Sequence, residues 1–553
     1  MASRCPPASR DAAAVHNIIN ENTKFEDIIE ELGSDGKFQL QMNIIFNFIA
    51  ILFSTMSSYA KIIALTVPEH WCHVPGREST NLTVEMWKNL TIPKEDGKYS
   101  RCLMKTPGQD NETMACIHGW DYDTTWFSVT AASQGNWVCD KELYPNTVYS
   151  VSHVVSTAVG VFMFYIGDRF GRKKQFLLGL SATALSQTLL PASVSVFPLY
   201  IALSAASEGT HLPMLEATMA TGVELASIKR RSSVNFVSFM SYCLGIIAIS
   251  LLAWLLKNWV HFTLVASVPC FIPLLLQRYL PESPRWLINK GHTEEAFKVL
   301  ERIARTNGKT LSPDIKKKIT FLSQQRTVNM GIGTIITNKN LLKNTILLVL
   351  SRSTAAFVTF TLLFSNNCFG ENPFVAFIGH GSLQLAASYS AHVVGNRFGR
   401  RITHCLVLLA AGLLCIILIC LTAAHSTQWI ITTLSLALLF CCDCSYLLTN
   451  IQSLELHPTS LRQIGIAIEY VFVQCSMSVP PYVAHLGKTA GMHIAFAILA
   501  AVTLIMSVLM SFVPESFNEK LPETKQDISL FGTKQKYWSL PSQKSNVSER
   551  TPM

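Results

Sequence analysis

The sequence predicts an all-α membrane protein with twelve transmembrane helices in two six-helix bundles, and three observations lead to this fold class. Apolar runs long enough to cross a bilayer recur along most of the chain. The composition is 49% hydrophobic and only 15% charged, whereas soluble domains carry about 25% charged residues. A short charged turn occurs twice, at matching points of the two halves.

The repeated turn is residues 167–174 (GDRFGRKK) in the first half and residues 395–401 (GNRFGRR) in the second. Each copy lies between two apolar runs. Recurrence at matching points of two halves is typical of a duplicated transporter.

The predicted spans follow from the apolar runs. They are 40–67, 144–166, 175–191, 197–222, 233–256, 259–280, 344–368, 371–395, 402–424, 428–450, 464–486 and 489–513. We therefore expect an N-terminal segment (1–39), a first bundle (40–280), a linker (281–343), a second bundle (344–513) and a tail (514–553). Short helices are expected at 25–32 and 294–304, and no cleavable signal peptide is predicted in 1–39.

The net charge of +9 fits the membrane better than a nucleic-acid partner, because the basic residues concentrate in loops on one side of the predicted topology. Cytoplasmic loops collect Lys and Arg. This asymmetry places both termini in the cytoplasm. The bases are Arg169, Arg172, Lys173, Lys174, Lys229, Arg230, Arg231, Arg397, Arg400, Arg401 and Arg462, together with the basic linker.

The long loop at 68–143 has the features of an extracellular domain. It holds four cysteines and three glycosylation sequons, which fit an oxidising compartment. Four cysteines allow three pairings, and spacing does not choose among them. The cysteines are Cys72, Cys102, Cys116 and Cys139, and the sequons are at Asn81, Asn89 and Asn111. No metal site is expected, since Cys441, Cys442 and Cys444 have no matching second pair.

Several motifs together resemble the organic cation, anion and carnitine transporter family of the major facilitator superfamily. Residues 68–72 (PEHWC) and 137–140 (WVCD) resemble the two ends of its extracellular loop, and 281–288 (PESPRWLI) matches its central-loop motif. Residues 454–459 (LELHPT) with Arg462 resemble the motif after its tenth helix. The sequence departs from the family in having four loop cysteines rather than six, and Asn396 where the second turn usually has an acid.

The resemblance implies that the charged turns control access from the cytoplasm. Breaking charge clusters at such turns would give two states of similar energy. The simpler alternative is positive-inside topology with no gating role, although it leaves Asp168 and Glu224 unexplained. The predicted gating residues are Asp168, Arg169, Arg172, Glu224, Arg231, Arg397, Arg400, Glu455 and Arg462.

Ionisable residues inside the spans are the candidate substrate ligands, since each costs about 2.5–3.5 kcal/mol to insert and needs a cavity or a partner. On the fourth span Glu208, His211 and Glu216 fall within an arc of about 140°. On the tenth, Tyr446 and Asn450 follow Asp443 on one face. Thr359 follows Arg352 on the seventh, Glu469 lies on the eleventh, and Lys61 lies near the outer end of the first. The resemblance places helices one, four, seven and ten around the cavity, and Gln384 and Gln474 where cation-selective members carry acids.

Four carboxylates lie deep in the spans, whereas Arg352 is the one base at that depth. This excess of negative charge favours a cationic or zwitterionic substrate, which would be carried by alternating access. The alternative is that these charges only hold helices together, for example Arg352 with Asp443 or Glu208. Rival functions are an organic-anion exchanger that uses Arg352 and a non-transporting membrane receptor. We expect a monomeric plasma-membrane protein with no enzymatic activity and no cofactor. Besides the bilayer and the small organic ion, protons or a counter-substrate are candidate partners, with His211 as a proton carrier.

Overall fold

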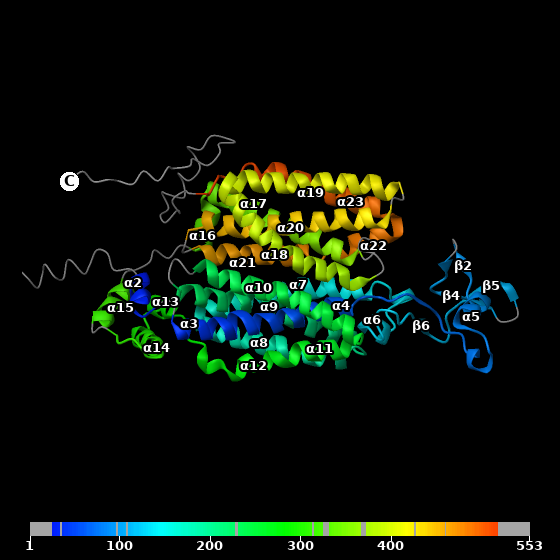
Figure 1. Cartoon of the computed structure of the whole chain (residues 1–553), viewed down its shortest axis with the longest axis horizontal. Helices are drawn as coiled ribbons and strands as arrows, with labels where there is room; N and C mark the ends of the chain where they lie inside the picture. Colours follow the sequence, from blue (N-terminus) through cyan, green and yellow to red (C-terminus); the bar gives the residue numbers. More distant parts are fainter. Residues whose placement is uncertain are drawn as a thin grey trace, which may run out of the picture.

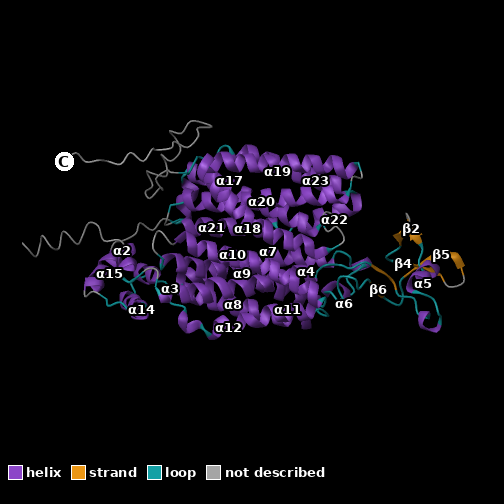
Figure 2. Cartoon of the chain, viewed as in Figure 1, coloured by secondary structure: helices purple, strands orange, loops and turns teal. Residues whose placement is uncertain are grey.

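The computed structural model describes residues 25–33, 36–95, 98–106, 109–226, 231–311, 314–324, 331–365, 372–424, 427–458 and 461–517. Long helices run side by side to form the body of the molecule, a small strand-containing domain extends from one end, and short helices cover the other (Figures 1 and 2). Most of the predicted tail (518–553), most of the N-terminal segment (1–24), and Lys229 and Arg230 lie outside the described residues.

The first bundle contains six spans, and its first and sixth spans are irregular. The first joins α3 (Lys37–Met42), a π-helical segment (Asn43–Ile49) and α4 (Ala50–Ala64). The sixth is broken near Pro269 into α11 (Trp259–Ser267) and α12 (Phe271–Leu275), since proline has no N–H to donate. The other four are α7 (Tyr144–Phe170), α8 (Arg172–Leu189), α9 (Phe197–Glu224) and α10 (Arg231–Leu256).

The second bundle repeats this arrangement, with its fifth span broken before Pro480. Its helices are α17 (Lys339–Phe364), α18 (Pro373–Phe398), α19 (Arg400–Ala423), α20 (Gln428–Leu456), α21 (Arg462–Ser476), α22 (Pro480–Ala490) and α23 (Met492–Met510). Short α16 (Ile332–Thr337) precedes it.

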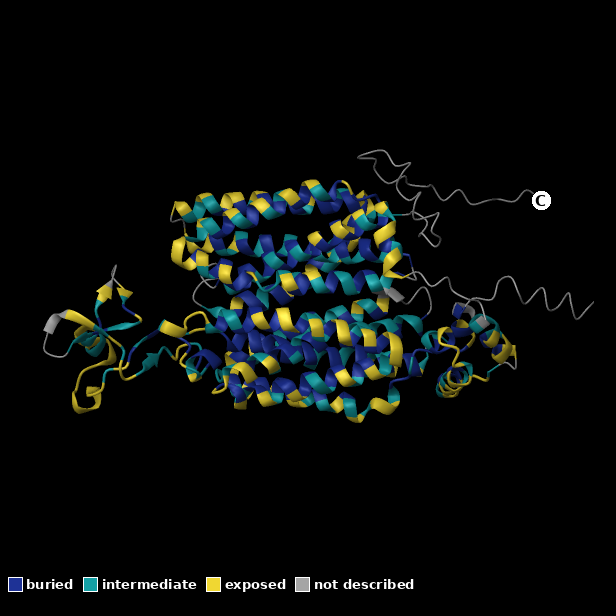
Figure 3. Cartoon of the chain, turned by 180° about the vertical axis from the view of Figure 1, so that it is seen from behind, coloured by how far each residue is buried: buried dark blue, intermediate teal, exposed yellow. Residues whose placement is uncertain are grey.

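Within the described chain, 9 helices are long and apolar enough to cross a membrane. The remaining three spans are α9, α18 and the broken α11–α12 pair. Helix α9 has 28 residues, long enough to cross, but it carries three glutamates. Exposed positions occur along the outer helices of the bundles (Figure 3). The exposed residues include large apolar side chains such as Leu255, Leu275 and Trp429, as expected of a surface in contact with lipid.

Several helices extend past the predicted spans at the end of the bundles that is predicted to be cytoplasmic. Helix α20 continues to Leu456 instead of ending at Asn450, and α17 begins at Lys339 rather than Asn344. The apolar runs marked only the part of each helix in lipid, whereas charged residues continue the same helices into water.

The loop at 68–143, predicted to be extracellular, folds into a small domain with three two-stranded sheets. These pair β1 (His70–Cys72) with β6 (Trp120–Tyr122), β2 (Lys94–Glu95) with β3 (Lys98–Tyr99), and β4 (Leu103–Thr106) with β5 (Gln109–Ala115). It also contains α5 (Val84–Thr91) and α6 (Ala131–Gln134). The disulfides are Cys72–Cys116 and Cys102–Cys139, a pairing that spacing left open. Such cross-links stabilise a domain whose apolar core is small.

The linker forms a compact helical unit at the cytoplasmic end. It contains α13 (Pro284–Asn289), α14 (Thr293–Thr306), which covers the predicted helix at 294–304, and α15 (Asp314–Gln324). Helix α2 (Phe25–Glu31) packs Ile28 and Ile29 into the same core. The Asn307 amide donates to the carbonyls of Leu32 and Gly33, which fastens the segment before the first span to the linker.

The two bundles meet along two helix pairs, with α10 against α18 and α7 against α21 (Figure 1). Toward the extracellular side this boundary is aromatic. The ring of Tyr149 lies 4.7 Å from that of Phe364, and the ring of Phe127 lies 5.0 Å from that of Phe374. The Ser150 hydroxyl donates to the Ser478 carbonyl at 2.6 Å. These contacts hold the extracellular ends of the bundles together.

Candidate transport site

The acid on α9 nearest the extracellular side is paired with a base of the first span. The Nζ atom of Lys61 lies 2.6 Å from Oε1 of Glu208, and the Lys61 side chain has no exposure to solvent. Burying a charge is costly unless an opposite charge accompanies it. Glu208 is therefore neutralised within the first bundle, by a residue that the sequence had placed nearer the membrane edge.

Two imidazoles lie beside this ion pair. His211 is one turn farther along α9, and His153 reaches the pair from α7, where its ring lies 4.3 Å from that of Tyr149. Both are buried. Among the described residues, neither ring nitrogen of His211 has a hydrogen-bond partner.

A second ion pair lies in the other bundle. Nη1 of Arg352 on α17 is 2.8 Å from Oε2 of Glu469 on α21, and Nη2 donates to Oδ1 of Asn450 at 2.6 Å. The guanidinium also lies 5.2 Å from the ring of Tyr446. The suggested pairing of Arg352 with Asp443 or Glu208 was wrong, because helix periodicity gives the face of a residue but not its neighbour on another helix.

Asp443 has a different partner, which the sequence did not indicate. Its Oδ2 lies 3.5 Å from Nδ1 of His380 on α18, with both side chains buried. The ring of His380 in turn lies 6.5 Å from that of Tyr59 in the first bundle. Asp443 therefore lies near the boundary between the bundles.

Glu216 differs from the other three interior acids. Its carboxylate has no hydrogen bond or ion pair to any residue that the structure describes, and like Glu208 it is partly exposed. Arg352 and Glu469, both of the other bundle, are within electrostatic range of its carboxylate. It is therefore an interior carboxylate close to charged groups of the other bundle.

The remaining predicted ligands are neutral and buried. Gln474 donates to the Ser156 hydroxyl at 3.1 Å and so connects α21 to α7. Gln384 accepts a hydrogen bond from the Cys243 thiol at 3.7 Å, which connects α18 to α10. Thr359 is buried on α17. Both glutamines therefore lie between the bundles.

The predicted gating residues of the first bundle form a cluster at its cytoplasmic end. Nη1 of Arg172 lies 3.0 Å from Oε1 of Glu224, whose carboxylate also accepts the Ser283 hydroxyl. The Glu282 carboxylate accepts the backbone N–H groups of Arg172 and Lys173 at 2.8 and 3.2 Å. Burial raises the pKa of Glu282, whereas these backbone hydrogen bonds act to lower it.

The second bundle repeats this cluster. Nη2 of Arg400 lies 3.5 Å from Oε1 of Glu455, which accepts the Ser516 hydroxyl at 2.6 Å. Glu515 accepts the N–H groups of Arg400 and Arg401 at 2.8 and 3.1 Å. Our sequence analysis missed this role, although the tripeptide Pro-Glu-Ser at 281–283 recurs at 514–516 and would have revealed it.

The other predicted gating residues make local contacts. Asp168 lies 3.6 Å from Lys290 of the linker, whereas Asn396 contacts His392 of its own helix, so the second turn lacks that ion pair. Arg462 donates to the Leu454 carbonyl at 2.8 Å. Arg169 and Arg397 lie over the neighbouring rings of Phe170 and Phe398, and the Arg231 side chain lies outside the described residues.

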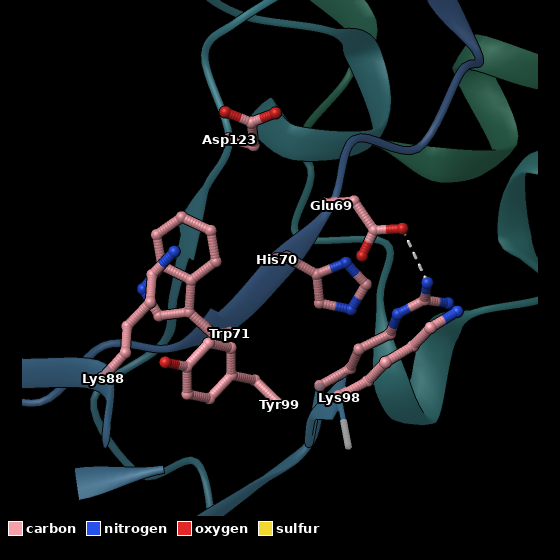
Figure 4. A pocket seen from close by; sticks show the side chains of 8 residues that line it. Glu69, His70, Trp71, Lys88, Lys98, Tyr99 and Asp123 are labelled. Atoms are coloured by element: carbon pink, nitrogen blue, oxygen red, sulfur yellow. Dashed lines mark hydrogen bonds and ion pairs between the residues drawn. The ribbon is translucent and has the colours of Figure 1, made fainter. Parts of the chain in front are cut away.

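A surface pocket of about 380 Å³ lies in the extracellular domain, away from the interior charges (Figure 4). In it the Lys88 ammonium lies 3.1 Å from the ring centroid of Trp71, and Arg101 pairs with Glu69 at 2.7 Å. Asp123, which also lines the pocket, accepts hydrogen bonds from the backbone N–H and the hydroxyl of Thr125. Of the sequons, Asn81 and Asn89 are exposed, and the Asn111 side chain lies outside the described residues.

Comparison with known proteins decides the family. The sugar (and other) transporter family matches residues 141–527. The chain belongs to this family. It is 26% identical to the Drosophila melanogaster carcinine transporter, across 93% of this chain and 80% of that protein. It is also 26% identical to mouse solute carrier family 22 member 6, across 95% of this chain and 97% of that protein.

Solved structures show the same fold. The inward-open xylose transporter XylE from E. coli superimposes with a TM-score of 0.56 at 15% identity, covering 89% of this chain and 100% of that one. A POT family transporter gives 0.53 at 14% identity, covering 87% and 98%. The twelve-helix major facilitator fold, the resemblance to the organic-ion carriers and the absence of enzymatic function are thereby confirmed. This protein is a multi-pass membrane transporter.

Proposed function

We propose that this transporter carries a small organic cation, or a zwitterion bound through its ammonium group, and that Glu216 is the anchoring carboxylate. The observation that supports this is the charge balance at the bundle boundary. Glu469 neutralises Arg352, so adding Glu216 leaves one positive and two negative groups, a net charge of −1 when all are ionised. A monovalent ammonium would cancel this charge.

Aromatic side chains near the boundary suit the same cargo. Tyr446 lies beside Arg352, and Phe357 and Phe360 of α17 are partly buried nearby on the same helix. Aromatic faces attract ammonium groups. Relatives named as carcinine and beta-alanine transporters also indicate cargo with an amino group. An organic anion would instead have to displace Glu469 from Arg352, which the 2.8 Å pair disfavours.

We further infer that transport proceeds by alternating access, with the repeated Arg–Glu–Ser clusters as cytoplasmic gates. The proposed topology has 1–39, 281–343 and 514–553 in the cytoplasm and a glycosylated 68–143 outside. The protein would act as a plasma-membrane monomer that exchanges its cargo against a proton or a counter-substrate, and a purely receptor role would leave the gates without a use.

The test is uptake into proteoliposomes of a labelled quaternary ammonium ion, a labelled zwitterionic amine and a labelled aromatic carboxylate. Glu216→Gln should raise the apparent KM for the cation by about 10-fold or more, the loss expected for one charged contact. Glu216→Asp should retain part of the affinity. The surface variant Glu301→Gln is the matched control. Uptake of the carboxylate alone, or an unchanged KM in Glu216→Gln, would overturn the proposal.

A further inference from the structure

The Lys61–Glu208 pair forms a second ionic centre that the proposed cation site does not use. It joins α4 to α9 within the first bundle, and its charges cancel at an Nζ–Oε1 distance of 2.6 Å. A pair that serves only to join two helices needs no further titratable group beside it. The histidines next to this pair therefore require a separate explanation.

His153 and His211 are 2% and 8% exposed, so neither is a surface residue. A buried polar nitrogen without a partner is unfavourable, and such groups in native proteins usually have a function or bind water. Both nitrogens of His211 are in this situation among the described residues. Lys61 already balances Glu208, so charge neutrality does not require either imidazole to be protonated.

The surroundings of Glu208 come from five helices. Among the described residues they contain one acid and one strong base, and imidazole is the side chain whose ordinary charge change lies closest to neutral pH. The ionisable groups within electrostatic range are Lys61 of α4, Tyr149 and His153 of α7, His211 of α9, Tyr242 of α10 and Tyr470 of α21.

We propose that His211, assisted by His153, is a proton-binding site and that the transporter exchanges a proton for its cationic cargo. The imidazole takes a proton from water when the site opens to one side and returns it to water on the other. This inference rests on the proposed cation function, because its effect is exerted on cargo at Glu216.

The coupling is electrostatic. His211 and Glu216 are five residues apart on α9, or about 7.5 Å along the helix axis. A proton on His211 adds a positive charge to a neutral centre and repels a cation at Glu216. At a separation of about 10 Å this repulsion weakens cation binding roughly tenfold. Proton and cation therefore occupy the protein alternately, which is the requirement for exchange.

The experiment uses the full chain in proteoliposomes with the membrane potential clamped at zero by valinomycin and equal potassium. Accumulation of the labelled quaternary ammonium ion is measured with an acidic lumen and with no pH gradient, and each value is divided by cation-for-cation counterflow in the same preparation. In the wild type, an acidic lumen should raise the ratio of cation accumulation to counterflow several-fold. The lumen should become more alkaline as protons leave in exchange for the cation, and a pH-sensitive dye detects this change. His211→Gln and His153→Gln should each lower it toward the no-gradient value.

His261→Gln is the matched control, because His261 is an exposed histidine on α11. It should keep the pH-driven ratio. Counterflow without any pH effect in the wild type would overturn proton exchange and leave the cation function standing. Absence of both uptake and counterflow would instead refute the cation function. Retention of the pH-driven ratio in both histidine variants would overturn the assignment to these residues.

Discussion

Arg352 and Glu469 form an ion pair with almost no solvent contact, so each partner depends on the other. The Arg352 guanidinium has two further contacts, the Asn450 amide oxygen and the Tyr446 ring, but Glu469 is its one ion-pair partner among the described residues. Removing one member of a buried pair leaves an uncompensated charge, whereas removing both is often tolerated.

Glu469→Gln should therefore destabilise the protein by about 3–5 kcal/mol, because Arg352 stays buried and charged. Unfolding in detergent, followed by intrinsic fluorescence, measures the change. The double variant Arg352→Gln/Glu469→Gln should recover part of the loss. Glu301→Gln removes an exposed helix-surface pair with Arg305 and should cost at most about 1 kcal/mol. Equal stabilities of Glu469→Gln and the wild type would show that the pair has no structural role.

The sequence identified most of the interior charged residues but not how they pair. The free-energy cost of inserting a charged side chain into the membrane is enough to identify the interior charged residues as candidates for a structural or functional role. These are Glu208, Glu216, Arg352, Asp443 and Glu469. Their partners include Lys61 and His380, and these come from helices whose relative rotation depends on packing along their whole length. Only the structure shows that, among the residues it describes, Glu216 is the interior acid without a hydrogen bond or an ion pair.

At the scale of elements, each charged turn is held by an acid that follows the last span of its bundle. Gly171 and Gly399 precede α8 and α19 with φ of 107° and 90°, a region that favours glycine. A Cβ at Gly171 would meet Glu282 at 2.2 Å. The glycines thus let Glu282 and Glu515 reach the first N–H groups of these helices.

Glu515→Ala should loosen the start of α19, because the N–H groups of Arg400 and Arg401 lose their acceptor. Loss of an N-terminal cap costs about 0.5–2 kcal/mol, so amide exchange in the first turn should accelerate by roughly 2- to 30-fold. Hydrogen–deuterium exchange of peptides from 400–423 measures this. Glu282→Ala should act in the same way on α8 and leave α19 unchanged. Exchange that is uniform along α19 in both variants would contradict the capping role.

The extracellular domain should lose stability in mild acid. His70 is buried beside the Cys102–Cys139 disulfide, and burial lowers its pKa from the ordinary value of 6.5. His70 therefore binds a proton more readily in the unfolded chain than in the folded domain. The free energy of unfolding keeps its full value above pH 6.5 and declines as the pH falls through the lower pKa that His70 has in the folded domain. Amide exchange of 68–143 at pH 7.5 and 5.5, corrected for intrinsic rates, should show this decline.

In His70→Gln that additional decline should disappear, because glutamine does not titrate. His118→Gln is a matched control on the exposed surface of the same domain. It should behave like the wild type. A pH response of the same size in His70→Gln would assign the effect to other groups.

For the whole molecule, the sequence predicted the architecture because each span contributes an apolar run of bilayer length. The prediction was weakest for features that depend on distant contacts. The pairing of Cys72 with Cys116 is one example. Cys72 lies in a strand of 3 residues and Cys116 directly follows a strand of 7, and strands this short carry little sequence pattern. The orientation of one bundle relative to the other is a second example. The same helices are present in every state of a transporter, so their sequence does not indicate which state a structure represents.

The bundles in this structure are closed toward the outside. The ring contacts of Tyr149 with Phe364 and of Phe127 with Phe374 cross between the bundles. At the opposite end, the ion pairs of the described chain join residues within the first bundle, the first bundle to the linker, or residues within the second bundle. In the predicted topology, with 68–143 outside, this is an outward-closed state, and we expect its stability relative to the outward-open state to depend on the aromatic contacts.

Phe374→Ala should shift this balance toward the outward-open state. The ring is fully buried on α18 and contacts both Phe127 and Trp254 of the first bundle. Two aromatic contacts contribute about 0.5–1.5 kcal/mol each beyond the free energy of burying their surface area, so losing them should raise the outward-open population by roughly fivefold or more.

Hydrogen–deuterium exchange should then accelerate at the extracellular ends of α7 and α17 and slow at the cytoplasmic ends of α9 and α20. Phe472→Ala removes an exposed ring on α21 and should change neither. Faster exchange at both ends of all four helices would indicate general destabilisation and contradict a two-state balance set by these rings.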